Sequence, residues 1–144
     1  MARLIAVAAL TVAALGLGAS ASATHGHSSY FVTPSHKIMC AWGAGDAQSR
    51  PSLRCDVGFA LNPRPSRPKW CDLDWAYGLS MSSVGRARPI CAGDSVFHGW
   101  KPVLAYGETW RKRGFTCYSR AIGLTCRNTQ EHGFFLSRER WHVF

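Results

Sequence analysis

Two histidines, His98 and His132, are the residues of this chain whose chemistry best suits proton transfer. A carboxylate lies near each of them in the sequence: Asp94 precedes His98, and Glu131 and Glu139 flank His132. Histidine titrates near neutral pH and arginines stabilise negative charge, so these residues could serve a small hydrolase acting on phosphodiester or glycosidic bonds. The sequence contains no G-x-S-x-G and no H-E-x-x-H, so this hypothesis rests on residue type alone.

A second carboxylate pair lies between two tryptophans, in Trp70-Cys-Asp-Leu-Asp-Trp75. Asp72 and Asp74 could support acid–base chemistry or hold a cation, but the same pair also suits a turn or the start of a helix. We expect no metal site and no cofactor. The three histidines within residues 25–36 belong to a type of N-terminal segment that is usually idle, and no C-x-x-C occurs.

Positive charge, most of it from arginine, is the strongest chemical feature of the sequence. Lys and Arg number 17 against 8 Asp and Glu, which gives a formal net charge of +9. Guanidinium groups bind phosphate and carboxylate through paired hydrogen bonds, so a basic extracellular protein is attracted to anionic polymers and surfaces. Nucleic acid is not indicated beyond this net charge. The predicted binding residues form two clusters, Arg64, Arg67 and Lys69 in the proline-rich loop 62–69, and Arg111, Lys112 and Arg113 in one run.

The cysteines are spaced as in a disulfide framework. The six are Cys40, Cys55, Cys71, Cys91, Cys117 and Cys126, and their spacing fits no zinc ribbon or finger. Cys40 and Cys55 each fall on the apolar face of a predicted strand, and Cys117 and Cys126 stand on either side of a short turn. If neighbours pair, Cys71–Cys91 is the third bridge.

The N-terminal segment, residues 1–23, is predicted to be a secretory signal peptide. A positively charged start and a long apolar run precede two A-x-A patterns, which place cleavage near Ala21 or Ala23. The mature form would then carry no transmembrane segment, and we expect it outside the cell or associated with the cell envelope. Residues 24–29 are predicted to be a flexible segment, and residues 30–144 a single disulfide-rich β domain.

Alternation of apolar and polar residues indicates short strands. Residues 37–42 and 53–57 are predicted to be a strand and its return, and residues 115–126 a hairpin. The predicted fold class is all-β, a small disulfide-stapled antiparallel barrel or sandwich with long Gly/Pro/Arg-rich loops. We find no internal repeat. We also expect no more than two of four tryptophans to be exposed, namely Trp70, Trp75, Trp100 and Trp110.

Six motifs spread over residues 33–138 occur together in a recognisable order. They are Thr33-Pro-Ser-His-Lys-Ile-Met-Cys40, Leu53-Arg-Cys-Asp56, Cys91-Ala-Gly-Asp94, Leu104-Ala-Tyr-Gly107, Gly123-Leu-Thr-Cys-Arg-Asn128 and His132-Gly-Phe-Phe-Leu-Ser-Arg138. The chain from Tyr30 to Phe144 thereby resembles a family of small secreted actinobacterial proteins with a domain of unknown function. The resemblance implies secretion and cysteine pairing and supplies no activity or ligand. It also implies small residues where this chain has His36 and Glu131.

Together these features favour a non-enzymatic extracellular binding protein with affinity for anionic surfaces or polymers. Its partner would be an anionic polymer of the cell envelope or an extracellular protein. Two alternatives stay open: a small secreted hydrolase that uses His132 or His98 with nearby carboxylates, and an inhibitor or effector that presents loop 62–69 on a stapled scaffold. The sequence does not decide among them, because catalytic groups must converge in space.

Overall fold

The structure is a computed structural model that describes residues 29–45 and 49–144. The predicted signal peptide, residues 1–23, lies outside the described residues, as do residues 24–28 of the predicted flexible segment. Over the described ranges, no helix is long and apolar enough to cross a membrane.

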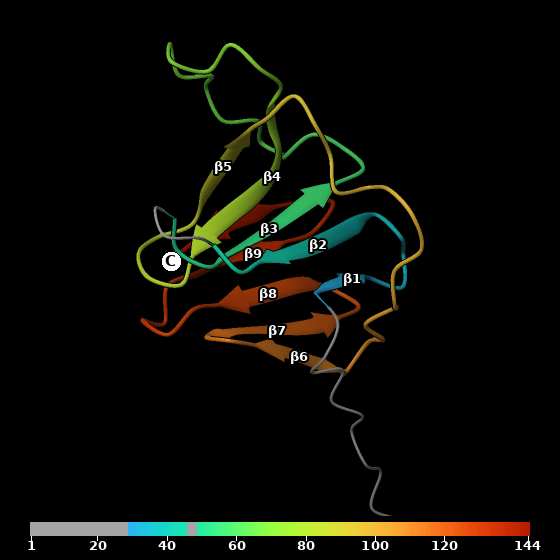
Figure 1. Ribbon diagram of the computed structural model, residues 1–144. Helices are drawn as coiled ribbons and strands as arrows, with labels where there is room; N and C mark the ends of the chain where they lie inside the picture. Colours follow the sequence, from blue (N-terminus) through green and yellow to red (C-terminus); the bar gives the residue numbers. More distant parts are fainter. Residues whose placement is uncertain (1–28, 46–48) are drawn as a thin grey trace, which may run out of the picture.

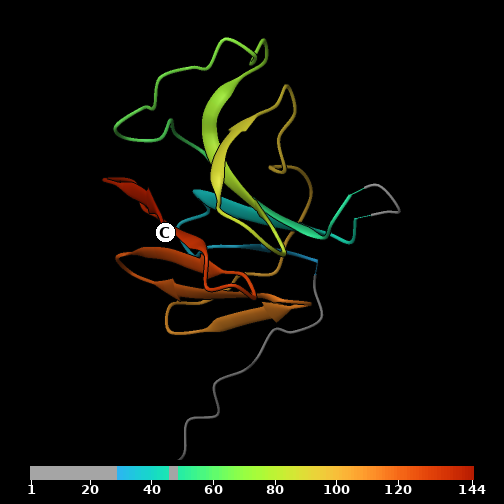
Figure 2. The ribbon, with the colours of Figure 1, turned by 90° about the vertical axis from the view of Figure 1, so that its left-hand side faces the viewer.

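Ten strands form two antiparallel sheets in the described part of the chain, which contains no helix (Figures 1 and 2). Sheet A has the order β1-β2-β3-β4-β5, and sheet B has the order β10-β9-β8-β7-β6. The strands of sheet A are β1 (Tyr30–Val32), β2 (Ile38–Gly43), β3 (Ser52–Val57), β4 (Trp75–Ser82) and β5 (Arg88–Cys91). Those of sheet B are β6 (Thr109–Lys112), β7 (Phe115–Arg120), β8 (Gly123–Arg127), β9 (Gly133–Leu136) and β10 (Trp141–Val143). The sheets do not close into a barrel, so the predicted all-β class is confirmed in its sandwich form.

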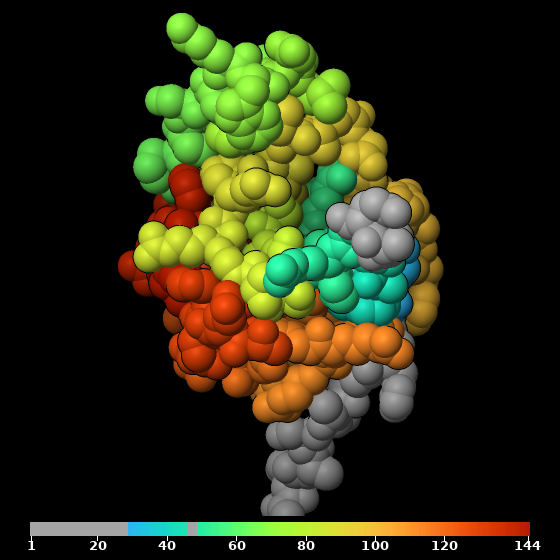
Figure 3. Space-filling view, turned by 60° about the vertical axis from the view of Figure 1, so that its left-hand side comes forward, coloured from blue at the N-terminus to red at the C-terminus, as the bar shows by residue number. Residues whose placement is uncertain are grey.

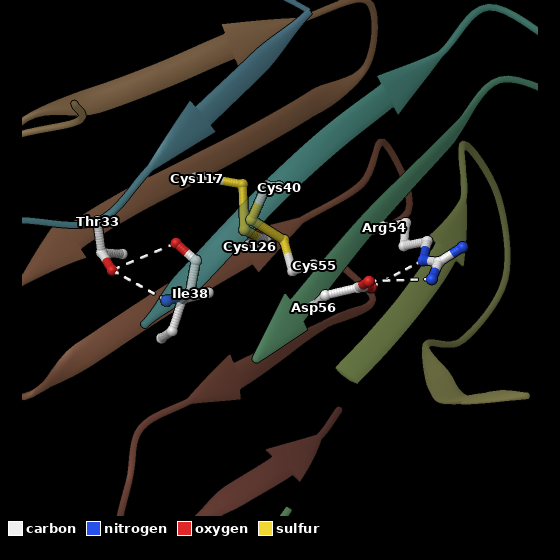
Figure 4. The surroundings of a disulfide bond; sticks show 8 residues. All are labelled: Thr33, Ile38, Cys40, Arg54, Cys55, Asp56, Cys117 and Cys126. Atoms are coloured by element: carbon white, nitrogen blue, oxygen red, sulfur yellow. Dashed lines mark hydrogen bonds and ion pairs between the residues drawn. A yellow bond between two sulfur atoms is a disulfide. The ribbon is translucent and has the colours of Figure 1, made fainter. Parts of the chain in front are cut away.

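The core lies between the two sheets and contains two cross-strand disulfides. Cys40 pairs with Cys55 between β2 and β3, and Cys117 pairs with Cys126 between β7 and β8, with Cα–Cα distances of 4.0 and 4.1 Å. All four cysteines are fully buried in one hydrophobic cluster (Figure 4). The third predicted bridge, Cys71–Cys91, joins the long β3–β4 connection to β5. All three predicted pairings are confirmed. Strand alternation directs Cys40, Cys55, Cys117 and Cys126 to the apolar face, whereas Cys71 lies outside any strand and its bridge to Cys91 is the pairing that remains.

The two sheets repeat one plan, contrary to the expectation of no internal repeat. Each has five strands in sequential order, with its disulfide between the second and third. The registers also correspond, since a buried aromatic residue lies opposite the first cysteine of each pair, Phe31 in sheet A and Trp110 in sheet B. These two rings contact each other across the core, with centroids 5.1 Å apart. The repeat is hidden in the sequence because the loops differ greatly in length.

The outer faces of the two sheets differ. Residues 92–104 run across the outside of sheet A, where Val96 packs with Val32 and Met39 and its backbone N–H donates to buried Asp56 at 3.0 Å. Arg54 on β3 adds hydrogen bonds to Asp94 in the same segment. The outside of sheet B instead carries exposed or half-exposed polar side chains along β7 and β8.

Candidate anion-binding site

A cavity of approximately 690 Å³ opens at the β6–β7 turn, a size typical of ligand sites. In Figure 3 the orange segment of β6 and β7 runs beside the orange-red segment that includes residues 128–132. The lining combines two aromatic residues, three consecutive cations and a polar wall: Trp42, Arg111, Lys112, Arg113, Gly114, Phe115, Thr116, Asn128, Thr129 and Glu131. The cavity therefore contains the whole second cluster of predicted binding residues.

The local sequence of β6 explains how these cations are presented. Strand alternation sends Trp110 into the core, where it is 0% exposed, and leaves Arg111 exposed on the outer face. Arg113 and Gly114 then form the two-residue turn, with φ values of 37° and 91°. Positive φ at both central positions matches the type I′ turn that joins strands most tightly. Arg113 thus stands at the tip of the hairpin, beside the cavity.

Lys112 is held in place by sheet A. Its Nζ lies 4.9 Å from the centroid of the Trp42 ring and donates a hydrogen bond to Ser29 Oγ at 3.1 Å. A cation over an indole face is attracted by the ring quadrupole, so this contact fixes one charge across the two sheets. The side chains of Arg111 and Arg113 form no hydrogen bond or ion pair with any other described residue. These two guanidiniums are the groups of this cavity that are available to a ligand.

The opposite wall is built around Asn128, which is buried. Its amide donates to the carbonyl oxygens of Ser82 at 3.1 Å and Gly85 at 2.8 Å, and its Oδ1 accepts from the backbone N–H of Gln130 at 3.0 Å. These bonds tie the β8–β9 turn to the β4–β5 turn of sheet A. The one carboxylate in the described lining, Glu131, accepts a hydrogen bond from Arg127 at 3.0 Å, so much of its charge is neutralised.

The first predicted cluster, in loop 62–69, is placed differently. Arg64 donates to the Trp75 carbonyl at 2.8 Å and lies over the Tyr77 ring, and Arg67 donates to the Leu73 carbonyl. The loop is also fixed by indole N–H groups, which donate to Pro65 and Pro63. Two of its three cations therefore hold the loop to the rest of the protein, and the predicted polyanion contact falls mainly on exposed Lys69.

Neither histidine forms an ion pair with its predicted carboxylate partners, although His98 lies near enough to Asp94 for its charge to help Arg54 lower the pKa of that carboxyl. The exposed His98 has its Nδ1 3.0 Å from the Ser95 carbonyl oxygen. Half-buried His132 lies in the turn before β9, and neither histidine forms an ion pair with a described carboxylate. Asp94, the predicted partner of His98, binds Arg54 at 2.7 Å, and this hydrogen bond lowers the pKa of Asp94.

Arg54 joins two carboxylates into a structural clamp. Its Nε lies 2.7 Å from Asp56 Oδ1, and the same guanidinium reaches Asp94. Burial alone would lower the pKa of Arg54, but the hydrogen bonds and charges of both aspartates outweigh it and leave that pKa raised. The guanidinium therefore stays charged and fixes residues 92–104 against sheet A.

The remaining predictions concern metal ligands and tryptophans. No group of three or more His, Cys, Asp or Glu in the described ranges could hold a metal ion, and Asp72 and Asp74 are both exposed. Trp70 is 67% exposed and Trp100 87%, whereas Trp75 and Trp110 are buried. The expectation that no more than two of these four indoles are exposed is confirmed.

Several site residues were missed by the sequence reasoning. Trp42 packs against the core, as its place on the face of Cys40 predicts, but it is half-buried and also forms a wall of the cavity. Arg120, Arg127 and Arg140 lie on or beside the outside of sheet B. The alternation that identified Cys117 and Cys126 as inward also placed Arg120 and Arg127 outward, so a signal for these two was present.

Fold and site together define a disulfide-stapled antiparallel β-sandwich with a cationic cavity at one hairpin. The chain belongs to DUF6636, a family of unknown function whose model matches residues 9–144. Comparison with curated proteins and with solved structures found no match. The predicted relationship to a domain of unknown function is thereby confirmed.

Proposed function

We propose that this protein is secreted, after signal-peptide cleavage near Ala21 or Ala23, and acts outside the cell as a non-enzymatic binding protein for anionic polymers of the cell envelope. Three disulfides in a chain of this size are consistent with an extracellular protein. The excess of Lys and Arg gives long-range attraction to negatively charged surfaces.

The observation that supports binding best is the pair of guanidiniums at the β6–β7 hairpin. Arg111 and Arg113 line one open cavity with Lys112, and the carboxylate opposite, Glu131, is already bound to Arg127. Arginine binds phosphate and carboxylate by paired hydrogen bonds, and unpaired guanidiniums favour such a ligand over water. The geometry supports this function better than hydrolysis, because the cations converge on one cavity and the histidines occupy separate segments.

The test is co-sedimentation of the mature, oxidised protein with purified cell envelope, combined with titration of fluorescently labelled polyphosphate. We expect Arg111→Gln/Arg113→Gln to weaken polyphosphate binding by about tenfold, since each exposed charge contact contributes roughly 0.5–1 kcal/mol. Arg88→Gln is the control, because it removes an exposed charge from β5 of sheet A, away from the cavity. It should change binding by less than about twofold.

Salt dependence and product analysis complete the test. Binding should fall steeply as salt is raised, because the anion exchanges protein cations for small counterions. Binding that does not change with salt concentration would contradict the proposal. Equal losses of polyphosphate binding in the double variant and in Arg88→Gln would also contradict it. Fragments that accumulate in the supernatant with time would show a hydrolase instead.

A further inference from the structure

The outer face of sheet B, which no described segment crosses, has a composition unlike that of an ordinary solvated sheet. Strand register arranges its outward side chains in three rows across the sheet. The rows are Thr109, Tyr118, Thr125, Phe135 and His142; Arg111, Thr116, Arg127 and Gly133; and Arg120 and Gly123. Hydroxyl groups on β7 and β8 thus lie beside rings and guanidiniums.

Two glycines leave room for two of the rings on this face. A Cβ at Gly123 would lie 2.6 Å from Phe135 Cζ, and a Cβ at Gly133 would lie 2.9 Å from Phe144 Cζ. A side chain at either position would also collide with a backbone carbonyl, Leu136 O or Cys126 O. His142 stacks beside Phe135 at 5.4 Å with an interplanar angle of 19°, and lies 5.9 Å from the Phe144 ring at 45°. The three rings therefore form a floor of packed, mutually tilted rings.

Guanidinium groups surround this floor. Arg140 lies 5.4 Å from the Phe135 ring and Arg127 lies 5.6 Å from the Phe144 ring. Arg120 ends β7 beside the same open hollow of approximately 610 Å³. No Asp or Glu side chain is among the described residues that line this hollow, so the side-chain charge of its lining is positive and complements an anion.

The face continues directly from the cavity at the hairpin. Thr116 lines that cavity and is the cross-strand partner of both Arg111 and Arg127. Neighbouring strands lie roughly 4.8 Å apart, so Arg111 and Arg127 are about 10 Å apart at the backbone. One extended polymer could therefore contact both surfaces.

We propose that the outer face of sheet B binds an acidic polysaccharide, a chain of sugar rings that bear carboxylates. This inference rests on the proposed function and names its substrate class. The hydroxyls of Thr116, Tyr118 and Thr125 match sugar hydroxyl groups, and the guanidiniums of Arg120 and Arg140 match carboxylates.

The same observations argue against single-stranded nucleic acid as the occupant. Proteins that bind it use exposed aromatic faces on which the bases stack. Phe135 is only 7% exposed, and Arg140 and His142 lie against it. A base therefore has no free face of Phe135 on which to stack, whereas a sugar needs only hydroxyl partners and charge.

The experiment compares four labelled probes on the full mature protein: oligogalacturonate, its methyl ester, polyphosphate and oligo-dT. We expect the acid to bind about tenfold or more tighter than its uncharged ester. Arg120→Gln/Arg140→Gln should weaken oligogalacturonate binding about tenfold, and Arg88→Gln should change it by less than about twofold. Arg120→Lys/Arg140→Lys should recover part of the loss, because it restores charge without the paired hydrogen bonds.

The outcomes separate this inference from the proposed function. If Arg111→Gln/Arg113→Gln loses oligogalacturonate binding and Arg120→Gln/Arg140→Gln does not, the outer face of sheet B is not the binding site. The proposed function of the cavity would then still stand. Oligo-dT that binds as tightly as oligogalacturonate and depends on the same arginines would overturn the sugar assignment. If none of the anionic probes binds, both the proposed function and the inference about the outer face of sheet B are wrong. Near-ultraviolet circular dichroism of each variant must match the wild type, so that a folding defect is excluded.

Discussion

The two sheets of this protein share one strand order and one disulfide position but differ in their loops and outer faces. Sheet A has long connections, residues 44–51 between β2 and β3 and residues 58–74 between β3 and β4. Sheet B joins β7 to β8 through residues 121–122 alone. Residues 92–104 cover the outside of sheet A and leave the outside of sheet B open. Equivalent cores can therefore support different surfaces, and the binding surfaces proposed here lie on or beside the more compact sheet.

The largest effect on stability should follow from reduction of the disulfides. This experiment tests whether the strand arrangement that the two sheets share depends on the disulfides. The chain-entropy estimate for loops of this size is about 3 kcal/mol each, against a typical total stability of about 5–15 kcal/mol. We expect the reduced and alkylated protein to be unfolded at room temperature, as measured by circular dichroism. A melting temperature that stays unchanged after alkylation would show that packing alone holds the two sheets.

The equivalence of the two sheets can be tested at Phe31 and Trp110. Both are buried opposite the first cysteine of their sheet, so truncation of either to alanine should cost about 3–5 kcal/mol of unfolding free energy. Urea denaturation of both single variants and the double variant measures their coupling, which should be about 1 kcal/mol for rings in contact. Additive losses, or a large loss at one site alone, would show that the positions are not energetically equivalent.

A smaller effect is expected where the two sheets are joined at the cavity wall. Asn128→Ala leaves two carbonyl oxygens of sheet A without their donor and should cost about 2 kcal/mol. Thr129→Val is the control, because it removes one exposed hydrogen bond, to Ser83, and should cost less than about 1 kcal/mol. The free energies come from urea titration monitored by tryptophan fluorescence. If the two variants lose equal stability, buried Asn128 is not the main link between the turns.

The smallest effect concerns acid stability at the covered face of sheet A. The pKa of Asp94 is lowered by its hydrogen bond to Arg54, so the ion pair contributes stability above the unfolded pKa of about 3.9. This contribution is lost as the pH falls through the lower pKa of the folded state. The difference in unfolding free energy between wild type and Asp94→Asn should therefore be constant above about pH 5 and shrink below pH 4. A difference that grew toward low pH would reverse the sign of this linkage.

The family resemblance carried structural information beyond the cysteines. It implied small residues at positions 36 and 131, and the structure gives His36 and Glu131 φ values of 54° and 59°. This left-handed region favours glycine because a Cβ crowds the following carbonyl. The two positions at which the resemblance implies a small residue are therefore positions whose backbone conformation favours glycine.

The candidate site was only half predictable. Arg111 and Arg113 were identified from a run of charge, and they do line a cavity. Arg64 and Arg67 were identified by the same reasoning, yet both donate to backbone carbonyls of nearby segments. A charged residue's availability depends on which acceptors the fold brings near it, and composition does not contain that information.

The sequence by itself determined the all-β class and the pairs Cys40–Cys55 and Cys117–Cys126, because alternation assigns each strand residue to a face and directs these cysteines inward; Cys71–Cys91 is the pair that remains. Only the tertiary structure decided that the two halves repeat one plan, that Trp42 meets Lys112 across the sheets, and that one outer face stays open. The physical reason is the difference in sequence separation between the interactions involved. Alternation is a local property of the backbone, whereas the contact between sheets and the path of residues 92–104 depend on packing between segments far apart in the chain.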